Sequence, residues 1–543
     1  MSRQIRKIKE ARNGNELGDK EDISADESVV NRGNVFDAFI ENDDEPDQLE
    51  GEFQLSQIPI NTFPEAVRIK KSSKKSAKSK KAKGKSSNST ELEEDIDELT
   101  NKFMIQDMQL LESTGVKESN VKSVPKRHIL AVDYRILDAE LELKRMFGSR
   151  VIEEGRNEQR LAVKAKYLLV KPKVTWPAWK NEGCSMVIFK HDSEMITFNL
   201  NHSKNYQAVQ LEFLQAVDTN DPASIQYLLQ RYPYSIDSLL QISLVYKHNG
   251  DAGILKLIVD MAADFVERAL YAFEQSLHPM FNISHGTCQL TFLRAENRPI
   301  FTAIFRHIDS LARKGCWKAA FEFQKLLFAL SPSDDPLCSL LFIDFYALKS
   351  GSFQWYLTFW DENVERLQVL PNAMYSRAVC QWEIETLASD SHDSSDLLLQ
   401  EAIRKFPGVV TAIFEKLSYS ELFMKHQIFS PYNATYAFDM YATLSIYQDL
   451  YIEKNHSLWK VPGILGWLRK NVSEVYKTVL DAPNQDPTWL TESRRLIDST
   501  YGKEGTIPTE LKRLIFISDA QQFNTRLPAV LEPIMGYREF NYR

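Results

Sequence analysis

The sequence predicts a mainly α-helical protein, a degenerate tetratricopeptide-like α-solenoid. It is preceded by a long N-terminal region whose charges lie in blocks of one sign and which we expect to be disordered. Three observations predict this fold class. From about residue 203 onward, amphipathic stretches with few internal Gly or Pro follow one another. Prolines recur within them at intervals close to those of a helical repeat. In contrast, the first 125 residues contain no Trp, Tyr or Cys and carry their charges in blocks.

Residues 1–125 are expected to form a disordered tail. An acidic block between Asp37 and Glu52, a lysine run and a second acidic block at 91–98 follow one another. Such a segment buries too little apolar area to offset the entropy lost on ordering. One short helix is predicted inside it, because four apolar residues recur at helical spacing: Leu92, Ile96, Leu99 and Phe103.

Residues 126–203 are predicted to form a mixed, irregular block ahead of the solenoid. Helical spacing through Leu137, Leu141 and Met146 predicts a helix that ends at Gly148. The stretch from 173 to 200 then contains helix-breaking residues and two tryptophans that flank a proline. We expect this stretch to be ordered but irregular, with two short strands.

Residues 204–420 are predicted to form the helical repeats. Ala320 lies twelve positions before Pro332, a spacing typical of the second helix of a tetratricopeptide-like unit, in which the small residue allows close packing and the proline ends the helix. Pro332, Pro371 and Pro407 are interpreted as helix-ending prolines, and they are 39 and 36 residues apart, against about 34 for a regular repeat. An irregular helical domain is the alternative.

Residues 421–543 are expected to be helical with a loop-like end. The clearest helix lies in LWKVPGILGWLRKNVSEVYKTVL, with Pro462 near its start. Its pattern predicts that Trp467 and Leu468 face inward.

Motifs for catalysis, cofactors and metals are largely missing from the sequence. No glycine-rich phosphate-binding loop and no H-E-x-x-H occurs. The nearest approach to a metal site is the set His278, His285 and Cys288, but a structural zinc site normally has four ligands, so a loop containing these residues by chance is the better interpretation. Cys316 follows Gly315 where a helix is expected to start, and we interpret it as a small packed residue. We therefore predict that the protein is not an enzyme and holds no cofactor or metal ion.

Composition also limits the compartment and the partners. Five scattered cysteines without a C-x-x-C pair are typical of reduced thiols in the cytosol or nucleus. We expect no secretory signal and no membrane span, because no suitable apolar segment occurs. The formal net charge of −8 argues against a protein coated in positive charge.

The lysine run between Ile69 and Ser87 contains no acidic residue. Each lysine that meets a phosphate releases counterions, so the run is suited to hold a polyanion such as ribosomal RNA. It contains no residue that reads base edges or stacks on bases, and we expect no sequence-specific DNA binding. A nuclear import signal and a solvated segment without function are the alternatives. The lysines are Lys70, Lys71, Lys74, Lys75, Lys78, Lys80, Lys81, Lys83 and Lys85.

Several blocks of the chain resemble the family of transcription factor 25, also called ribosome quality control complex subunit 1. They are RHILAVDYRILDAELELKRMFGSR (127–150), KVTWPAWKNEGCSM (173–186), PYSIDSLLQIS (233–243), VERALYAFEQSLHPMF (266–281), DPLCSLLFIDFYAL (335–348) and LWKVPGILGWL (458–468). The N-terminal succession of Asn31-Arg32, Phe36, an acidic block, the lysine run and EEDIDEL also follows the family's order. The resemblance covers roughly residues 125–470.

The resemblance implies a non-catalytic subunit of the ribosome-associated quality control complex, both cytoplasmic and nuclear. Proteins of this family work on stalled 60S subunits beside the listerin-type E3 ubiquitin ligase and promote ubiquitin chains on the trapped nascent chain. They help to bring in the valosin-containing-protein-type ATPase, which extracts the chain for the proteasome. A nuclear transcriptional repressor that acts through protein contacts is the alternative. A third hypothesis, a tetratricopeptide co-chaperone, would require a regular array of Lys and Arg that the sequence does not show.

Candidate contact residues combine the resemblance with the residue patterns. The lysine run from Lys70 to Lys85 would touch ribosomal RNA or serve as an import signal. The block around Trp176, Pro177 and Trp179, together with the solenoid, would hold the ligase and ubiquitin. For the two tryptophans, packing in the core is the alternative.

Overall fold

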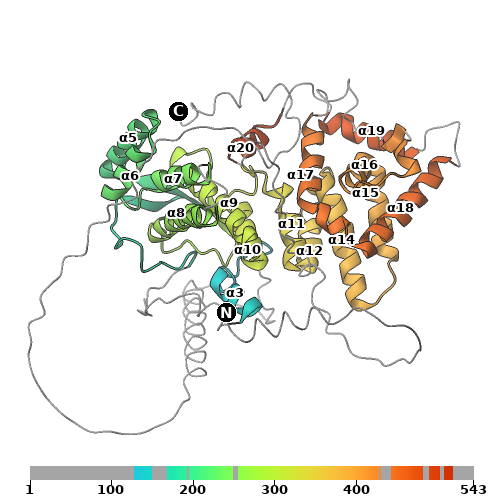
Figure 1. The fold of residues 1–543 in the computed structure, drawn as a ribbon, viewed down its shortest axis with the longest axis horizontal. Helices are drawn as coiled ribbons and strands as arrows, with labels where there is room; N and C mark the ends of the chain where they lie inside the picture. Colours follow the sequence, from blue (N-terminus) through green and yellow to red (C-terminus); the bar gives the residue numbers. More distant parts are fainter. Residues whose placement is uncertain are drawn as a thin grey trace, which may run out of the picture. The chain divides into compact units, whose positions relative to one another are not determined.

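The computed structural model describes residues 128–148, 168–192, 195–248, 255–425, 427–429, 442–480, 488–501 and 507–517 (Figure 1). The predicted N-terminal tail with its short helix and the lysine run lie outside the described residues, as does most of the predicted loop-like end. For these segments the expectations stay predictions.

The described chain is mainly helical, as predicted, and successive helices pack against one another as in an α-solenoid. The array begins with α5 (Lys204–Asp218), α6 (Pro222–Arg231), α7 (Ile236–His248), α8 (Leu255–Gln275), α9 (Arg298–Arg313) and α10 (Trp317–Leu330). It continues with α11 (Ile343–Ser350), α12 (Phe353–Glu362), α13 (Val364–Leu367), α14 (Pro371–Ala388), α15 (Asp393–Lys405), α16 (Pro407–Lys416), α17 (Ala442–Trp459), α18 (Pro462–Leu480), α19 (Thr488–Tyr501) and α20 (Thr509–Ile517). Contacts of α15 with both α18 and α19 depart from a regular repeat, so the solenoid is degenerate.

Prolines mark the beginnings of helices as well as their ends. Pro332 follows α10, as predicted. The expectation that Pro371 ends a helix is wrong, because Pro371 is the first residue of α14. Pro407 both stops α15 and begins α16, since Phe406 alone separates the two helices. A first-turn N–H has no partner within its own helix, so proline fits this position without loss.

The helix predicted near Pro462 is confirmed as α18, which begins at that proline. Trp467 and Leu468 are 6% and 0% exposed, so both face inward as expected. The indole Nε1 of Trp467 also donates to Asp396 on α15, which ties α18 to the preceding array.

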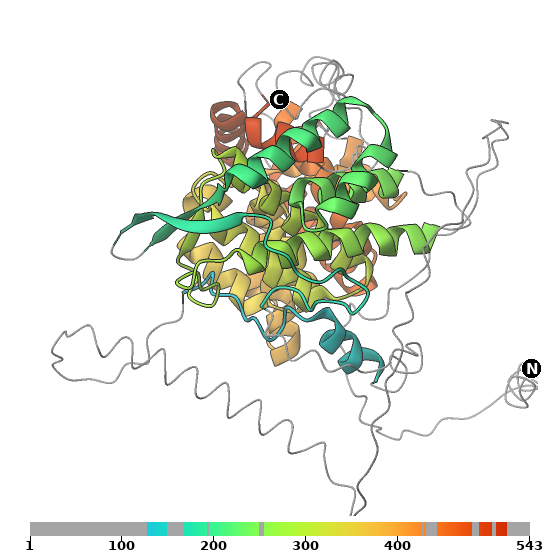
Figure 2. The ribbon, with the colours of Figure 1, turned by 90° about the vertical axis from the view of Figure 1, so that its left-hand side faces the viewer.

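Two short strands precede the array, as predicted. β1 (Cys184–His191) and β2 (Ile196–His202) pair antiparallel, with a bulge between Ile188 and Lys190. Figure 2 shows this hairpin extending beyond the helices. A third strand, β3 (Cys288–Leu290), pairs parallel with β2 and was not predicted, because three residues are too few for a periodic signal.

An irregular segment with two turns, residues 128–137, contacts α10 and α12 and is called the strap here. Its Asp133 N–H donates to Glu322 Oε2 on α10 at 2.8 Å, and its Ala131 carbonyl accepts from Lys325 Nζ at 3.1 Å. Glu322 and Lys325 form a buried ion pair with each other at 2.8 Å. The indole of Trp355 on α12 donates to the strap's Ile129 carbonyl at 2.9 Å. The strap therefore satisfies charged and polar groups that the helices bury.

The strap leads into α3 (Ala139–Phe147), the helix predicted to end at Gly148. Gly148 has a φ of 82° and its N–H donates to Lys144, which is a glycine stop. Glu142 of α3 accepts from the backbone N–H groups of Lys318 and Ala319 at 3.0 and 2.9 Å. These are first-turn donors of α10, whose own preceding residue, Cys316, makes no side-chain cap. One helix thus caps another across a long stretch of sequence.

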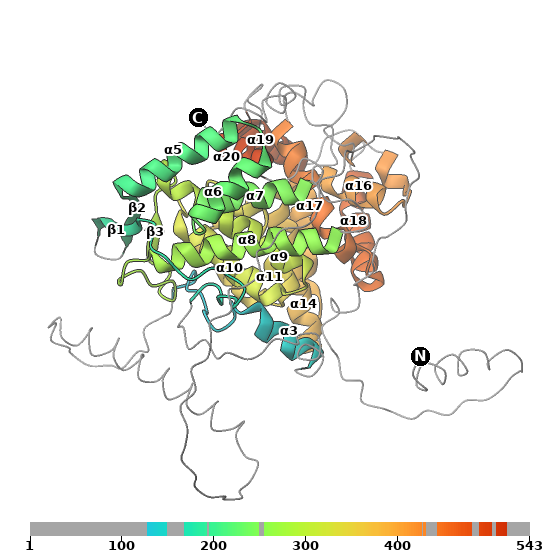
Figure 3. The same ribbon diagram turned by 60° about the vertical axis from the view of Figure 1, so that its left-hand side comes forward.

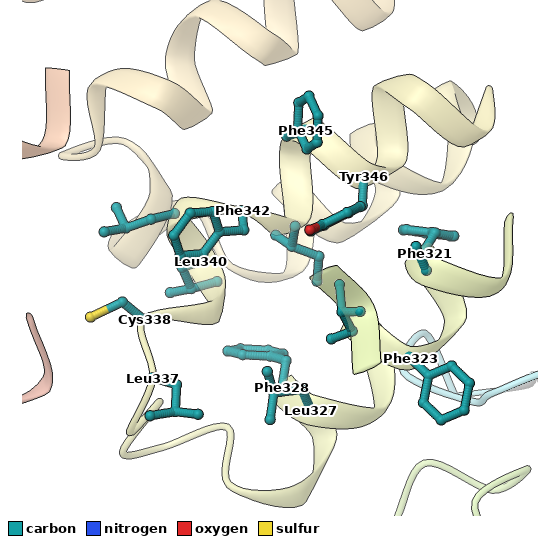
Figure 4. Packing of buried hydrophobic residues seen from close by; sticks show 14 of the residues in the cluster. Phe321, Phe323, Leu327, Phe328, Leu337, Cys338, Leu340, Phe342, Phe345 and Tyr346 are labelled. Atoms are coloured by element: carbon teal, nitrogen blue, oxygen red, sulfur yellow. The ribbon is translucent and has the colours of Figure 1, made fainter. Parts of the chain in front are cut away.

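Most of the buried apolar side chains in the described residues form one cluster that runs from Leu130 to Ile515. α10 lies at its centre, since every residue from Ala319 to Leu330 is buried. Figure 4 shows Phe323, Leu327 and Phe328 of α10 together with the side chains that follow in α11. The division of the chain into parts at 126, 204 and 421 stays a prediction.

Candidate partner-binding site

Residues 168–182 run along α8, which packs between α7 and α9 (Figure 3). The carboxylate of Glu274 on α8 accepts from the N–H groups of Leu168, Leu169 and Val170 at 2.7, 2.9 and 3.4 Å. One half-buried carboxylate therefore pairs three main-chain donors that no strand or helix satisfies. This contact fixes the start of the segment that contains the predicted tryptophans.

Trp176 is 8% exposed and serves as the second anchor of the segment. Its indole Nε1 lies 3.0 Å from both carboxylate oxygens of Asp264 on α8. Lys173 Nζ pairs with the same Asp264 at 2.7 Å and with Glu267 at 2.6 Å. Trp176 thus packs in the core, and its polar edge is satisfied.

Pro177 and Trp179 lie at the surface beside two tyrosines. Trp179 is 37% exposed, and its ring centroid lies 4.8 Å from that of Tyr234 and 5.9 Å from that of Tyr271, both in edge-on geometry. The Tyr234 hydroxyl donates to the carbonyl of Pro177. The aromatic rings hold this surface rigid, because each is fixed by another ring or a hydrogen bond.

Arg268 of α8 lies beneath these rings. The residue is 9% exposed, and its guanidinium carbon lies 5.8 Å from the Tyr234 ring and 5.5 Å from the Phe265 ring. Its Nε is buried without an acceptor, and no carboxylate or carbonyl in the described part of the chain pairs with the guanidinium. Burial lowers the pKa of Arg268. A buried guanidinium without a hydrogen-bond acceptor is costly and therefore unusual.

Glu182 lies on the other side of Tyr234. Its Oε1 accepts from the Tyr234 N–H at 2.9 Å, whereas its Oε2 is buried without a donor among the described residues. Burial raises the pKa of this carboxyl. We call the set Trp176, Pro177, Trp179, Glu182, Tyr234, Arg268 and Tyr271 the aromatic site.

The sequence singled out three residues of the aromatic site and missed the rest. Arg268 and Tyr271 come from α8, and Tyr234 from the turn before α7, all far along the chain. A signal for them was present, because three of the blocks that carry the family resemblance, 173–186, 233–243 and 266–281, meet here. Trp, Tyr and Arg are the residue types that dominate binding energy at protein interfaces.

The three residues considered as a metal site do not form one. In the described ranges, no group of three His, Cys, Asp or Glu side chains is placed to hold a metal ion. Cys288 is 5% exposed on β3 and accepts from the Asn282 N–H at 3.2 Å, and His278 packs its ring against Phe198. Cys316 is fully buried, and burial raises the pKa of its thiol to about 12, which fits a packed residue.

No helix in the described part of the chain is long and apolar enough to cross a bilayer. The longest, α8, carries Asp264, Glu267, Arg268 and Glu274 along its length. All four face the segment or the helices described above.

Fold and site together define a helical-repeat protein of the α-solenoid class with an aromatic site on its surface. Residues 198–540 match the family model described as transcriptional repressor TCF25. The chain belongs to the TCF25 family.

Curated relatives agree with this family. A Homo sapiens protein named ribosome quality control complex subunit TCF25 is 33% identical over 78% of this chain and 63% of its own length. Ribosome quality control complex subunit 1 of Schizosaccharomyces pombe is 30% identical over 75% and 60%. A probable transcription factor, claV, of Ampulloclitocybe clavipes is 30% identical over 63% and 48%. The chain thus spans about three fifths of the length of the first two, and no solved structure matches it.

Proposed function

We propose that the protein is a non-catalytic subunit of a ribosome quality control complex. In this role it binds stalled 60S subunits, promotes listerin-type ubiquitylation of the trapped nascent chain, and aids extraction by a valosin-containing-protein-type ATPase. The observation that carries the proposal is the naming of the human and S. pombe relatives as subunits of that complex, over three quarters of this chain. The site of action is the cytoplasm, with a second pool in the nucleus.

The proposed division of labour separates protein contacts from RNA contacts. The solenoid and the aromatic site hold the ligase and ubiquitin, because a helical array presents a large surface and the site has the composition of an interface hot spot. The lysine run from Lys70 to Lys85 contacts ribosomal RNA or acts as an import signal.

Sedimentation of ribosomes through sucrose after induced stalling tests the proposal. We expect the protein in the fraction of free 60S subunits. Replacing the nine lysines by Gln, or raising the salt, should release it, because phosphate contacts made by lysine depend steeply on salt. Trp179→Ala should leave the protein on the 60S subunit but reduce the ligase recovered with it. Absence of the wild-type protein from the 60S fraction would reject the proposal.

A nuclear transcriptional repressor that acts through protein contacts is the second candidate. It is favoured by the description of the family model and by the name of the A. clavipes relative. Chromatin fractionation separates the two candidates. Retention on chromatin together with absence from stalled 60S subunits would favour the repressor.

A further inference from the structure

Arg268 is the one guanidinium of the aromatic site. No acceptor in the described residues hydrogen-bonds to it, although the carboxylates of Asp264 and Glu182 lie near enough to act on its charge. A buried ion normally has a paired charge or at least a full set of hydrogen bonds. The guanidinium of Arg268 lies over two aromatic rings, and no described group accepts from its N–H donors. Its Nε is buried, whereas its two Nη nitrogens are not among the buried unpaired atoms and so keep some exposure to solvent.

The shape of the guanidinium determines which ligand suits Arg268. Its N–H donors form a planar fork, which a carboxylate matches with two parallel hydrogen bonds. A phosphate fits less well, because its double charge would lie near Glu182 and Asp264, both of which act on the charge of Arg268. A singly charged carboxylate matches the site better than a phosphopeptide or a nucleic acid.

Glu182 offers an incoming segment no free acceptor. Its Oε1 is taken by the Tyr234 N–H, and its Oε2 is buried without a donor. The exposed edge of the site is therefore formed by the Arg268 guanidinium and the aromatic residues. At this edge, Pro177 and Trp179 offer an exposed apolar surface for a neighbouring side chain.

We propose that the aromatic site binds an extended segment of a partner protein through an Asp or Glu side chain, whose carboxylate pairs with the Nη groups of Arg268 while an apolar residue packs on Trp179. This inference rests on the proposed role of the site in partner binding and adds the chemistry that the partner must present.

A random heptapeptide library, displayed on phage within a coat protein so that no peptide has a free C-terminus, is the probe. Selection on the immobilised full-length chain should enrich Asp or Glu next to an apolar residue. The best sequence is then made as a labelled peptide together with its Glu→Gln or Asp→Asn twin. On the wild-type chain the twin should bind about tenfold more weakly, because it loses a charge-assisted pair.

Substitutions in the protein, combined with the two peptides, complete a double-mutant cycle. With Arg268→Gln, the acidic peptide and its neutral twin should bind equally, which assigns the difference to this guanidinium. Arg377→Gln is the matched control, because Arg377 also stacks on a ring, Trp360 at 4.7 Å, but lies beside Glu401. It should leave the tenfold difference intact. If Arg268→Gln does not fold, comparison of the two peptides on Trp179→Ala and on the wild-type chain still shows whether the preference for the acidic peptide belongs to the aromatic site.

The possible outcomes separate this inference from the proposal beneath it. Selected peptides that depend on Trp179 but show no preference for an acidic residue would reject the carboxylate contact and retain the aromatic site as a binding site. Peptides that bind equally well to the Trp179→Ala variant would reject the aromatic site as their binding site. A peptide that binds only with a free C-terminal carboxylate would replace the side chain by the chain end and overturn the inference as stated.

Discussion

Glu267 shows how this fold keeps a charge inside. Its side chain is 12% exposed, and its oxygens lie 2.6 Å from Lys173 Nζ and 3.3 Å from Lys314 Nζ. Burial alone would raise the pKa of Glu267, but the two lysines outweigh burial and lower the pKa to about 2. Nearby, burial lowers the pKa of His307 to about 4, so this histidine is neutral at pH 7. The lysine charges, rather than the histidine, balance Glu267.

Replacing Glu267 by Gln should lower the free energy of unfolding by about 2 kcal/mol at neutral pH, because two lysines lose a charged acceptor. A lowered carboxyl pKa stabilises the fold above its unfolded value of 4.5, and this contribution is lost as the pH falls toward 2. The acid-induced loss of stability should therefore be shallower in the variant. Urea unfolding over a pH series measures both effects.

Glu474→Gln is the control for this measurement, because it removes only the exposed pair of Glu474 with Lys477. It should change the free energy of unfolding by less than about 0.5 kcal/mol. Equal effects of the two substitutions would contradict the interpretation of Glu267.

For Asp344 we expect the opposite dependence of the unfolding free energy on pH. It is 1% exposed on α11 and accepts from Asn372 Nδ2 at 3.0 Å and Ser376 Oγ at 2.7 Å, yet burial raises its pKa to about 6. Its contribution to stability is complete below 3.8 and is lost as the pH rises through about 6. Asp344→Asn should flatten the fall of the unfolding free energy across this window, measured by urea unfolding. Burial raises the pKa of Glu383 to about 7 with the same sign, so a residual slope remains. An unchanged slope would count against Asp344.

Gly286 determines how closely the strap approaches its neighbours. It has a φ of +72°, and a Cβ there would lie 2.8 Å from Ala131 N and 2.9 Å from His128 Nδ1, both in the strap. The adjoining hydrogen bond from the Val132 N–H to the Ile283 carbonyl, at 3.1 Å, depends on the same close approach.

Two glycine substitutions test this contact as a matched pair. Gly315 has a φ of +74°, but a Cβ there would meet no other atom within 4 Å, so Gly315→Ala should cost only the strain of the left-handed backbone, about 1 kcal/mol. Gly286→Ala carries the same strain and must also displace the strap, so its cost should exceed this by at least about 1 kcal/mol. Urea unfolding measures both. Equal costs would show that the strap moves freely.

Elements with local signals could be predicted from the sequence, and contacts between distant elements could not. The stop at Gly148, the start of α18 and the β1–β2 hairpin each follow from a few neighbouring residues. β3 and the strap contacts depend on partners far along the chain, which no periodic pattern reveals. The aromatic site falls between these cases. The two tryptophans around Pro177 stand out in the sequence. Arg268 does not, because its aromatic neighbours Tyr234 and Phe265 are brought to it only by the fold.

At the scale of the whole molecule, the strap changes what an α-solenoid is expected to do. Regular repeats contact only their neighbours and unfold in stages. Here the strap joins α10 and α12 through partners 189, 194 and 226 residues away, and the apolar cluster is continuous. Both features favour a single cooperative transition within the described residues.

Urea unfolding followed by tryptophan fluorescence and by far-ultraviolet circular dichroism should give coincident midpoints. Trp355→Phe keeps an aromatic ring but removes the hydrogen bond to the Ile129 carbonyl, so both midpoints should fall together by an amount equivalent to about 1 kcal/mol. Two separated transitions, or a shift in only one of the signals, would show that the array unfolds in parts.

The buried pair of Glu322 and Lys325 is synthesised long after the strap that it contacts. Asp133 is translated 189 residues before Glu322, and at about 5–20 residues per second that interval lasts roughly 10–40 s. During this interval the strap lacks its hydrogen-bond acceptor, Glu322, which has not yet been synthesised. Docking of the strap on α10 is consequently a late event in the synthesis of this protein, and pauses in translation between the two positions would lengthen the interval before it.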